Sequence, residues 1–182
     1  MNICVFGASS NEIDPAFFEL GEALGRAMAE RGHTLVFGGG DRGLMGAAAR
    51  GAASRGGRIV GVAPRFFDRP GILYKTGAEQ VFTETMAERK TLMRSRADAF
   101  VALPGGIGTM EEILEVITLR TLGQTDKPAA FLDCDGYWLP TVEALRMTVD
   151  KGFAKPGLME TFDYFTDAEA CLRYLEGKRH DL

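Results

Sequence analysis

The sequence predicts an α/β fold in which a mainly parallel sheet of about six or seven strands is covered by helices. Short runs rich in β-branched and aromatic residues alternate along the chain with longer runs that have the period of an amphipathic helix. Three of the short runs also end in glycine-rich turns. Alternation of strands with helices is typical of parallel sheets, so this architecture is expected.

The candidate strands are short, rich in β-forming residues and bounded by turn residues. They begin with the run NICVF near the N-terminus and continue at intervals that leave room for a helix between most of them. In order, they cover residues 2–6, 34–37, 58–63, 79–82, 99–103, 128–133 and 162–166.

The candidate helices lie between these strands and are bounded by residues that start and stop helices. Pro15 and Pro140 fall where helices begin, because the first helical positions need no amide hydrogen. Gly32 and Gly123 fall where helices end, since glycine readily adopts the left-handed conformation of a C-cap. The helices are predicted at residues 15–31, 43–55, 86–97, 109–122, 138–151 and 167–176.

The composition excludes several classes of protein. A net charge of −4 lacks the broad positive field that a nucleic-acid polymer requires, so any anion site must be local. The start MNICVFGASS has no basic segment, and no apolar run reaches the ~20 residues of a membrane span. Three cysteines far apart in sequence fit neither a disulfide framework nor a zinc site. We expect one cytoplasmic domain, residues 1–182, without a metal, a membrane or a nucleic-acid partner.

The glycine-rich turns predict where a ligand binds. They follow the first, second and fifth candidate strands, at residues 7–10, 38–40 and 105–109. In a parallel α/β sheet these turns share the carboxyl edge, where helix N-termini present free amides to an anion. The sequence therefore predicts a site for a phosphorylated small molecule.

The run GGGDRG at 38–43 matches the dinucleotide pattern G-x-G-x-x-G, but its context does not. That fingerprint belongs to the first β–α turn and has an acidic residue about 20 positions further on, whereas this run follows the second strand and lacks the acid. A tight turn that only brings two backbone segments together is the simpler alternative for Gly38 to Gly40.

Glu112 lies just after the third glycine turn, and two interpretations of it stay open. Residues 109–112 fit a capping box, in which Thr109 caps the helix and the glutamate reaches back to the amide of the cap. A turn that holds a phosphate gains nothing from a nearby carboxylate, unless the carboxylate faces another part of the ligand. The hydroxyls of a sugar are natural partners for it. Glu111 is either a surface acid favoured by the helix dipole or a second ligand contact.

The segment 86–98 is strongly basic. On a helix Arg89 shares one face with Met93, whereas Lys90 and Arg94 share a neighbouring face. A basic face of this kind is often only a solvated surface. Because the helix leads directly into the strand that bears the third glycine turn, a role in ligand binding is the alternative.

Together these motifs resemble the LONELY GUY family of phosphoribohydrolases. PGGIGTMEE at 104–112 is similar to the family motif P-G-G-x-G-T-x-x-E. The further runs GGGDRGLMG at 38–46, MAERK at 86–90 and DKPAAFLDCDGYW at 126–138 look like the family and occur in its order. The resemblance covers nearly the whole chain.

The resemblance implies a Rossmann-like, doubly wound nucleotide-binding domain with helices on both faces of the sheet, usually dimeric. It implies hydrolysis of the N-glycosidic bond of nucleoside 5′-monophosphates, AMP or cytokinin ribotides, to a free base and ribose 5-phosphate. Arg89 and Glu112 match the catalytic pair. The positions expected to bind substrate are Ser9, Gly38, Gly39, Gly40, Met86, Lys90, Gly105, Gly106, Ile107, Gly108, Thr109, Glu111 and Thr118. Older labels call such proteins lysine decarboxylases, but the chain shows no reason for pyridoxal phosphate, and no cofactor is expected.

Three departures from the family motifs concern the base. Ala87 stands where the family has a histidine, Ile107 replaces the aromatic residue of P-G-G-Y-G-T, and TLRTLG at 118–123 replaces TWxQLG. We expect phosphate and ribose recognition to be retained, and leave the preferred base open. The irregular segment 64–79 is the candidate for a mobile loop over the site.

Two alternatives to a specific cytokinin enzyme stay open. Molybdenum-cofactor carrier proteins look similar around the glycine turn and hold a phosphorylated pterin without converting it. A housekeeping nucleotidase that acts on several monophosphates is the other alternative. The presence of both Arg89 and Glu112 at the family's spacing favours an enzyme over a carrier.

Overall fold

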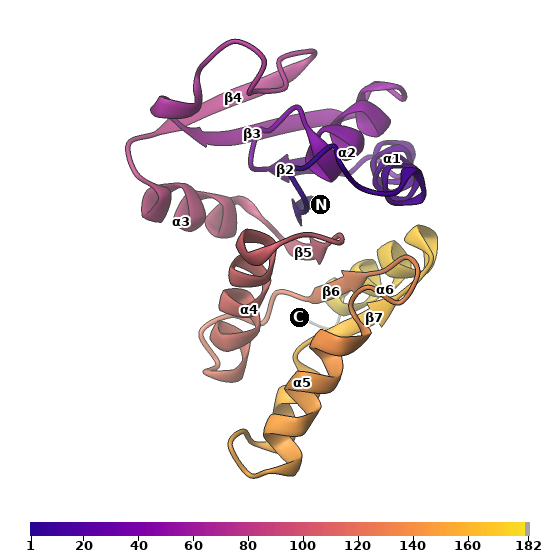
Figure 1. Ribbon diagram of the computed structural model, residues 1–182, viewed down its shortest axis with the longest axis vertical. Helices are drawn as coiled ribbons and strands as arrows, with labels where there is room; N and C mark the ends of the chain where they lie inside the picture. The colour runs from indigo at the N-terminus through magenta and orange to yellow at the C-terminus, as the bar shows by residue number, and fades with distance from the viewer. Residues whose placement is uncertain (181–182) are drawn as a thin grey trace.

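The computed structural model describes residues 1–180, which form one seven-stranded sheet with helices on both faces (Figure 1). The strand order is β4-β3-β2-β1-β5-β6-β7, and all neighbouring strands are parallel. The strands are β1 (Asn2–Phe6), β2 (Thr34–Phe37), β3 (Arg58–Pro64), β4 (Ala78–Thr83), β5 (Ala99–Ala102), β6 (Ala129–Leu132) and β7 (Asp163–Phe165). The predicted doubly wound α/β class is confirmed.

The helices lie between the strands, as the sequence predicts. They are α1 (Pro15–Glu30), α2 (Gly43–Ala53), α3 (Met86–Arg96), α4 (Ile107–Thr121), α5 (Leu139–Asp150) and α6 (Ala168–His180), with short 3-10 helices η1 (Arg65–Phe67) and η2 (Pro156–Glu160). Gly32 and Gly123 follow α1 and α4 with φ angles of 73° and 66°, the left-handed conformation expected of them. Three predicted ends differ by two residues or more: α2 ends two residues before residue 55, α4 begins two residues before residue 109, and α6 continues four residues beyond residue 176.

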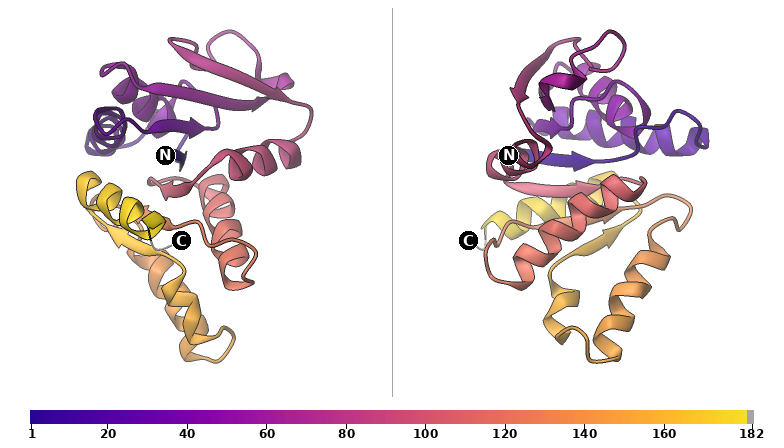
Figure 2. Two further views of the ribbon diagram at one scale, coloured as in Figure 1. Left: turned by 180° about the vertical axis from the view of Figure 1, so that it is seen from behind. Right: turned by 60° about the vertical axis from the view of Figure 1, so that its left-hand side comes forward.

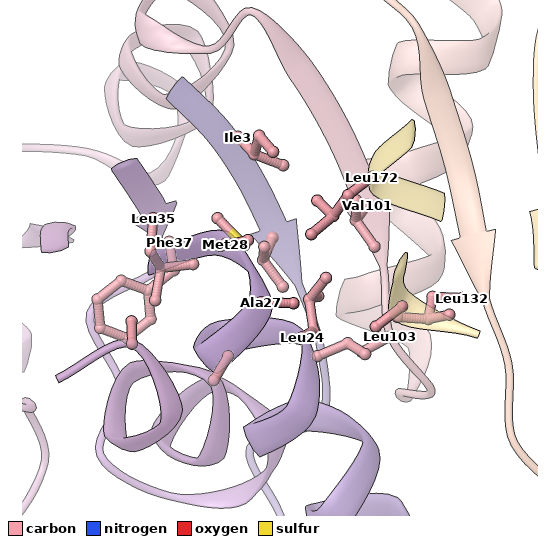
Figure 3. Close-up of a cluster of buried hydrophobic side chains, with 14 of the residues drawn as sticks. Ile3, Leu24, Ala27, Met28, Leu35, Phe37, Val101, Leu103, Leu132 and Leu172 are labelled. Atoms are coloured by element: carbon pink, nitrogen blue, oxygen red, sulfur yellow. The ribbon is translucent and has the colours of Figure 1, made fainter. Parts of the chain in front are cut away.

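One face of the sheet packs against α1, α2 and α6 (Figure 3). Because successive side chains of a strand point to opposite faces, Ile3 and Val5 of β1 belong to this layer. Leu24 and Met28 of α1 are fully buried against them, as is Leu172 of α6. This apolar layer fixes α1 and α2 beside the carboxyl ends of β1 and β2.

The opposite face packs against α3, α4 and the segment from Trp138 to Phe162. Cys4 and Phe6 of β1 point to this side. The ring centroid of Phe131 lies 5.0 Å from that of Trp138 and 5.3 Å from that of Phe162, so aromatic packing anchors the C-terminal part. Burial of these large side chains stabilises each by about 1.5 to 3 kcal/mol relative to exposure.

The order of the strands reverses between β1 and β5. From β1 the chain winds through β2 and β3 to β4 at one edge, then returns through α3 to β5 on the other side of β1. In open α/β sheets ligands bind at the carboxyl ends of the strands where the order reverses. The topology therefore places the expected site above the ends of β1 and β5.

The helix α5 extends from one end of the molecule, together with the turn that follows it (Figures 1 and 2). None of its residues is fully buried, and Phe153 in the following turn is 87% exposed. Of the helices in residues 1–180, none combines the length and the apolar character that a membrane crossing requires.

Candidate active site

A cavity of about 640 Å³ lies at the carboxyl ends of β1, β2 and β5. Its volume is within the range of sites for small molecules. Residues from the turns after these strands line it, with residues from α3, α4 and the segment after β3. The lining residues are Gly7, Ala8, Ser9, Gly38, Gly40, Arg42, Met45, Phe67, Ile72, Leu73, Met86, Arg89, Gly106, Ile107, Gly108, Thr109 and Glu112.

An ion pair between Arg89 and Glu112 forms one wall of this cavity. Arg89 Nη1 donates to Glu112 Oε1 at 2.9 Å, and the two side chains are only 9% and 13% exposed. Arg89 Nε also donates to the carbonyl oxygen of Val62 at 3.2 Å. The guanidinium is therefore fixed by α3, β3 and α4 together, and it holds Glu112 in a single position.

Burial raises the pKa of Glu112 above its ordinary value of 4.5. The positive charge of Arg89 and its hydrogen bond act in the opposite direction, but the loss of solvent is the larger effect. A buried carboxylate with a single cationic partner is typical of a functional site, since structural ion pairs lie mostly at the surface. Glu112 lines the cavity, and within residues 1–180 its second carboxylate oxygen has no hydrogen-bond donor.

Gly38 makes room for the Arg89 guanidinium. A Cβ atom at this position would collide with Arg89 Nη2, and it would also lie 3.2 Å from the sulfur of Met45. Gly38 therefore does more than permit a tight turn. The absence of a side chain at this position leaves the space that the Arg89 guanidinium occupies.

The N-terminus of α4 opens into the cavity. The helix begins at Ile107, its N-cap is Gly106, and no side chain caps it. The first amides of an α-helix have no intrahelical acceptor, so those of Ile107, Gly108 and Thr109 can serve an anion. Five of the sequence-predicted ligand positions meet here or close by: Ser9, Gly106, Ile107, Gly108 and Thr109.

The predicted capping box is wrong. Thr109 lies inside the first turn of α4 and does not cap it, since the cap is Gly106. Glu112, in the second turn, bonds to Arg89 and makes no bond back to the amide of residue 109. The capping interpretation is thereby excluded, and Glu112 lines the cavity.

Hydrogen bonds connect the turn after β1 to the start of α2 and to the residue before the third glycine turn. The amide of Ala8 donates to the carbonyl oxygen of Pro104 at 3.0 Å, and the amide of Leu44 donates to that of Ala8 at 2.8 Å. Tyr137 Oη donates to the carbonyl oxygen of Gly105 at 2.7 Å. The turn after β1, the start of α2 and the third glycine turn are therefore held together without a ligand.

Several predicted ligand residues lie outside the cavity of this chain. Lys90 forms ion pairs with Glu111 and, at 3.4 Å, with Glu115, and these side chains lie on the outer surface of α3 and α4. The Glu111 hydrogen bond raises the pKa of Lys90. Thr118 is exposed on α4 and donates to the carbonyl oxygen of Leu114 at 2.8 Å.

Gly39 and Gly105 also do not line the cavity, although their neighbours do. Gly39 has a φ of 76° and its carbonyl oxygen accepts from the amide of Tyr74. A Cβ atom at Gly105 would collide with the Thr109 side chain and lie 2.9 Å from the amide of Ala8. Both glycines shape the turns beside the cavity.

The segment after β3 closes one side of the cavity, as expected for 64–79. Phe67, Ile72 and Leu73 line it, and an antiparallel bridge joins Leu73 to Gly40. Sequence reasoning singled out the segment but not these side chains. It also missed Met45 and Arg42, although Arg42 lies within the run GGGDRG, and it predicted the turn at 7–10 without naming Gly7 and Ala8 as ligand positions.

The fold and the site define an α/β protein with a small-molecule cavity at its topological switch point, where a buried Arg–Glu pair stands beside an open helix N-terminus. A sequence model of the family described as "Possible lysine decarboxylase" matches residues 45–175. The cytokinin riboside 5′-monophosphate phosphoribohydrolase LOG7 of Arabidopsis thaliana is 38% identical over 174 residues, which are 96% of this chain and 80% of the relative. For LOG5 of the same plant the values are 36%, 96% and 76%. The chain belongs to the LONELY GUY family of phosphoribohydrolases.

Solved structures show how widely the fold is shared. A molybdenum-cofactor carrier protein from Chlamydomonas reinhardtii superimposes with a TM-score of 0.74 at 20% identity, covering 99% of this chain and 98% of that protein. The molybdenum cofactor binding protein of Rippkaea orientalis gives 0.72 at 19% identity, with coverage of 97% and 96%. At this identity the likeness is one of fold alone.

Proposed function

We propose that this protein hydrolyses the N-glycosidic bond of nucleoside 5′-monophosphates, which yields a free base and ribose 5-phosphate. The observation that carries the proposal is the buried Arg89–Glu112 pair, held at 2.9 Å on the wall of a cavity beside the open N-terminus of α4. The relatives at 36% to 38% identity carry the name of this activity.

The 5′-phosphate and the ribose of the substrate bind to different parts of the cavity. The amides at the start of α4 take the 5′-phosphate, because they combine free N–H donors with the positive end of the helix dipole. Glu112 lies one turn further along α4 than these amides and faces the ribose. Ile72 and Met86 give the rest of the cavity an apolar wall, which suits the base.

Glu112 stabilises the charge that develops on the sugar. The bond from C1′ to the base nitrogen breaks, its electron pair leaves with the base, and positive charge spreads over C1′ and the ring oxygen. Water adds to C1′, one of its protons is lost, and the base takes up a proton. The Glu112 carboxylate stabilises the cation and orients the water, and Arg89 holds the carboxylate in place.

The buried carboxylate of Glu112 also helps to distinguish an enzyme from a carrier protein. A protein that only binds a phosphorylated ligand needs the amides at the start of α4, but it does not need a buried carboxylate next to them. The solved carrier proteins resemble this chain in fold alone, at about 20% identity, whereas the phosphoribohydrolases named above are 36% to 38% identical to it. Both observations support an enzyme.

The experiment that tests this function is a panel of substrates. The pure protein is incubated with AMP, GMP, CMP and isopentenyladenosine 5′-monophosphate, and free bases are separated by chromatography while ribose 5-phosphate is quantified in parallel. We expect base and sugar phosphate in equal amounts from at least one substrate. Thermal stabilisation by these ligands without any free base would instead identify a carrier.

The panel also decides the preferred base. Ile107, which replaces the family's aromatic residue, is 84% exposed at the mouth of the cavity, and Ala87 replaces a histidine. We propose that these changes alter base recognition and leave the phosphate and ribose contacts intact. Similar rates with AMP and with the isopentenyl substrate would support a broad housekeeping activity.

We propose that the active form is a homodimer in the cytoplasm. Leu122 at the end of α4 is 64% exposed, and Leu139 and Met147 of α5 are 50% and 56% exposed, so apolar side chains are available for contact with a second chain. The three cysteines are free, which suits a reducing compartment. Size-exclusion chromatography with light scattering should give twice the chain mass of 19.8 kDa, whereas a single chain mass would contradict the dimer.

A further inference from the structure

Arg42 is the charged residue of the cavity that the proposed mechanism does not use. It immediately precedes α2 and lines the cavity together with Ser9 and Gly108. Its side chain is exposed and does not cap the helix. Within residues 1–180 it has no ion-pair or hydrogen-bond partner for its guanidinium.

The other charges of the cavity cancel each other. Arg89 is paired with Glu112 at 2.9 Å, and those two residues and Arg42 are the charged side chains in the cavity lining given above. One positive charge, that of Arg42, therefore stays uncompensated in the described part of the chain. Lys90, the cation that family resemblance suggested for the substrate, is instead engaged by Glu111 and Glu115 outside the cavity.

Backbone hydrogen bonds place Arg42 across the β1 turn from the start of α4. Leu44, two residues after Arg42, donates to the carbonyl oxygen of Ala8, and Ala8 donates to that of Pro104, just before the turn into α4. The amide of Gly43 is occupied by Asn11 Oδ1 at 2.8 Å. The start of α2 thus presents no free amide at Gly43 or Leu44, and its contribution to the cavity is the side chain of Arg42.

We infer that Arg42 binds the 5′-phosphate of the substrate against the N-terminus of α4, and so makes the site select nucleoside monophosphates over nucleosides. The inference rests on the proposed function. A guanidinium offers a planar fork of donors that matches two phosphate oxygens, whereas the α4 amides approach the anion from the other side of the β1 turn. A neutral nucleoside leaves this positive charge unused.

The variants Arg42→Ala and Arg42→Lys test the inference, with Arg58→Ala as the matched control. Arg58 is an exposed arginine at the opposite, amino-terminal edge of the sheet, so its loss changes net charge equally without touching the cavity. Isothermal titration measures the affinity for ribose 5-phosphate, which the protein cannot hydrolyse further. Initial rates with AMP and adenosine give the ratio of the two kcat/KM values.

We expect Arg42→Ala to weaken ribose 5-phosphate binding by about 10- to 100-fold, the usual loss of a charge-assisted hydrogen-bonded pair. The ratio of kcat/KM for AMP to that for adenosine should fall by a similar factor. Arg42→Lys should retain part of the affinity, because lysine keeps the positive charge but lacks the paired donors of a guanidinium. Arg58→Ala should bind as the wild type does.

Wild-type affinity for ribose 5-phosphate in Arg42→Ala would overturn the inference, as would a wild type that does not bind ribose 5-phosphate. Thermal unfolding of each variant shows whether it is folded, and Arg42→Lys provides the comparison if Arg42→Ala is not. Failure of the proposed function has a different signature: no base is released from any monophosphate, while the binding titrations still decide the role of Arg42.

Discussion

At the scale of single residues, the buried carboxylate of Glu112 makes a distinctive prediction about pH. Burial raises its pKa above 4.5, so its δ-carboxyl carbon should titrate above that value in a ¹³C NMR experiment. The signal is assigned by its absence in Glu112→Gln. An inflection at or below 4.5 would show that the Arg89 charge outweighs burial.

The same shift affects stability, with a sign that follows from linkage. A raised pKa in the folded state means that folding favours the protonated form of Glu112. Its contribution to the free energy of unfolding is therefore fully present below pH 4.5 and is lost as the pH rises through the folded-state pKa. Urea unfolding of the wild type and of Glu112→Gln over this pH range measures the effect. The free energy of unfolding of the wild type, relative to that of Glu112→Gln, should fall as the pH rises.

Gly38→Ala should damage the site without a change in any charged residue. The added methyl group collides with the Arg89 guanidinium, which must leave its position between the Val62 carbonyl and Glu112. We expect base release to fall at least about 10-fold, since a displacement of about 1 Å can cost more than that.

Gly177→Ala is the control for this variant, because nothing lies within 4 Å of the added methyl group. It should leave activity unchanged and raise the free energy of unfolding by about 0.5 to 1 kcal/mol, as glycine is unfavourable within a helix such as α6. Equal activity of Gly38→Ala and the wild type would mean that Arg89 need not be fixed for the reaction.

Sequence patterns identified the site residues that belong to recognisable motifs, but they misplaced residues whose position depends on packing between helices. Arg89 and Glu112 were found because each belongs to a dense motif on a helix. Arg42 was overlooked because its motif was considered only for its glycines. Lys90 and Thr118 lie on helix faces whose direction depends on packing between α3 and α4, which spacing along one helix does not determine.

At the scale of elements, the start of α4 shows where sequence rules and packing conflict. Glycine and proline normally indicate a turn, so the helix was predicted to begin at Thr109 with a capping box. The structure starts it at Ile107, since the first helical positions need no intrahelical acceptor and glycine is tolerated there. The two extra residues place open amides in the cavity, which a side-chain cap would have occupied.

Tyr137 connects the C-terminal segment to this helix start. Its hydroxyl donates to the Gly105 carbonyl oxygen at 2.7 Å, and its ring contacts that of Phe17 edge-on. Tyr137→Phe keeps the ring and removes one hydrogen bond, which should lower the free energy of unfolding by about 0.5 to 1.5 kcal/mol. Thermal denaturation measures this loss, and an unchanged midpoint would show that the bond contributes nothing.

The strands and most helix ends were predictable because local and tertiary preferences agree. The run NICVF is β-rich and also has apolar side chains for both faces of a covered sheet, so β1 occupies the predicted residues 2–6. Pro15 and Gly32 determine the ends of α1 in the same local way. The order of the strands could not be obtained from such signals, because it depends on contacts between distant residues.

At the scale of the whole molecule, the strand order explains why the site lies where it does. The reversal between β1 and β5 brings three turns from distant parts of the chain to one edge, and α3 crosses there to carry Arg89. The three turns are separated in sequence by whole strands and helices, so the fold alone brings them together. A cavity of this kind is available to carriers and enzymes alike, and the Arg89–Glu112 pair favours the enzyme.

The most direct measurement compares adenine release from AMP by the wild type and by Glu112→Gln, with ribose 5-phosphate binding measured on both. Glutamine keeps the shape of Glu112 but cannot stabilise a cation on the sugar. We expect equal amounts of adenine and ribose 5-phosphate from the wild type, and a rate at least about 100-fold lower in the variant with little change in binding. Adenine release by Glu112→Gln at the wild-type rate would contradict a catalytic role for this carboxylate.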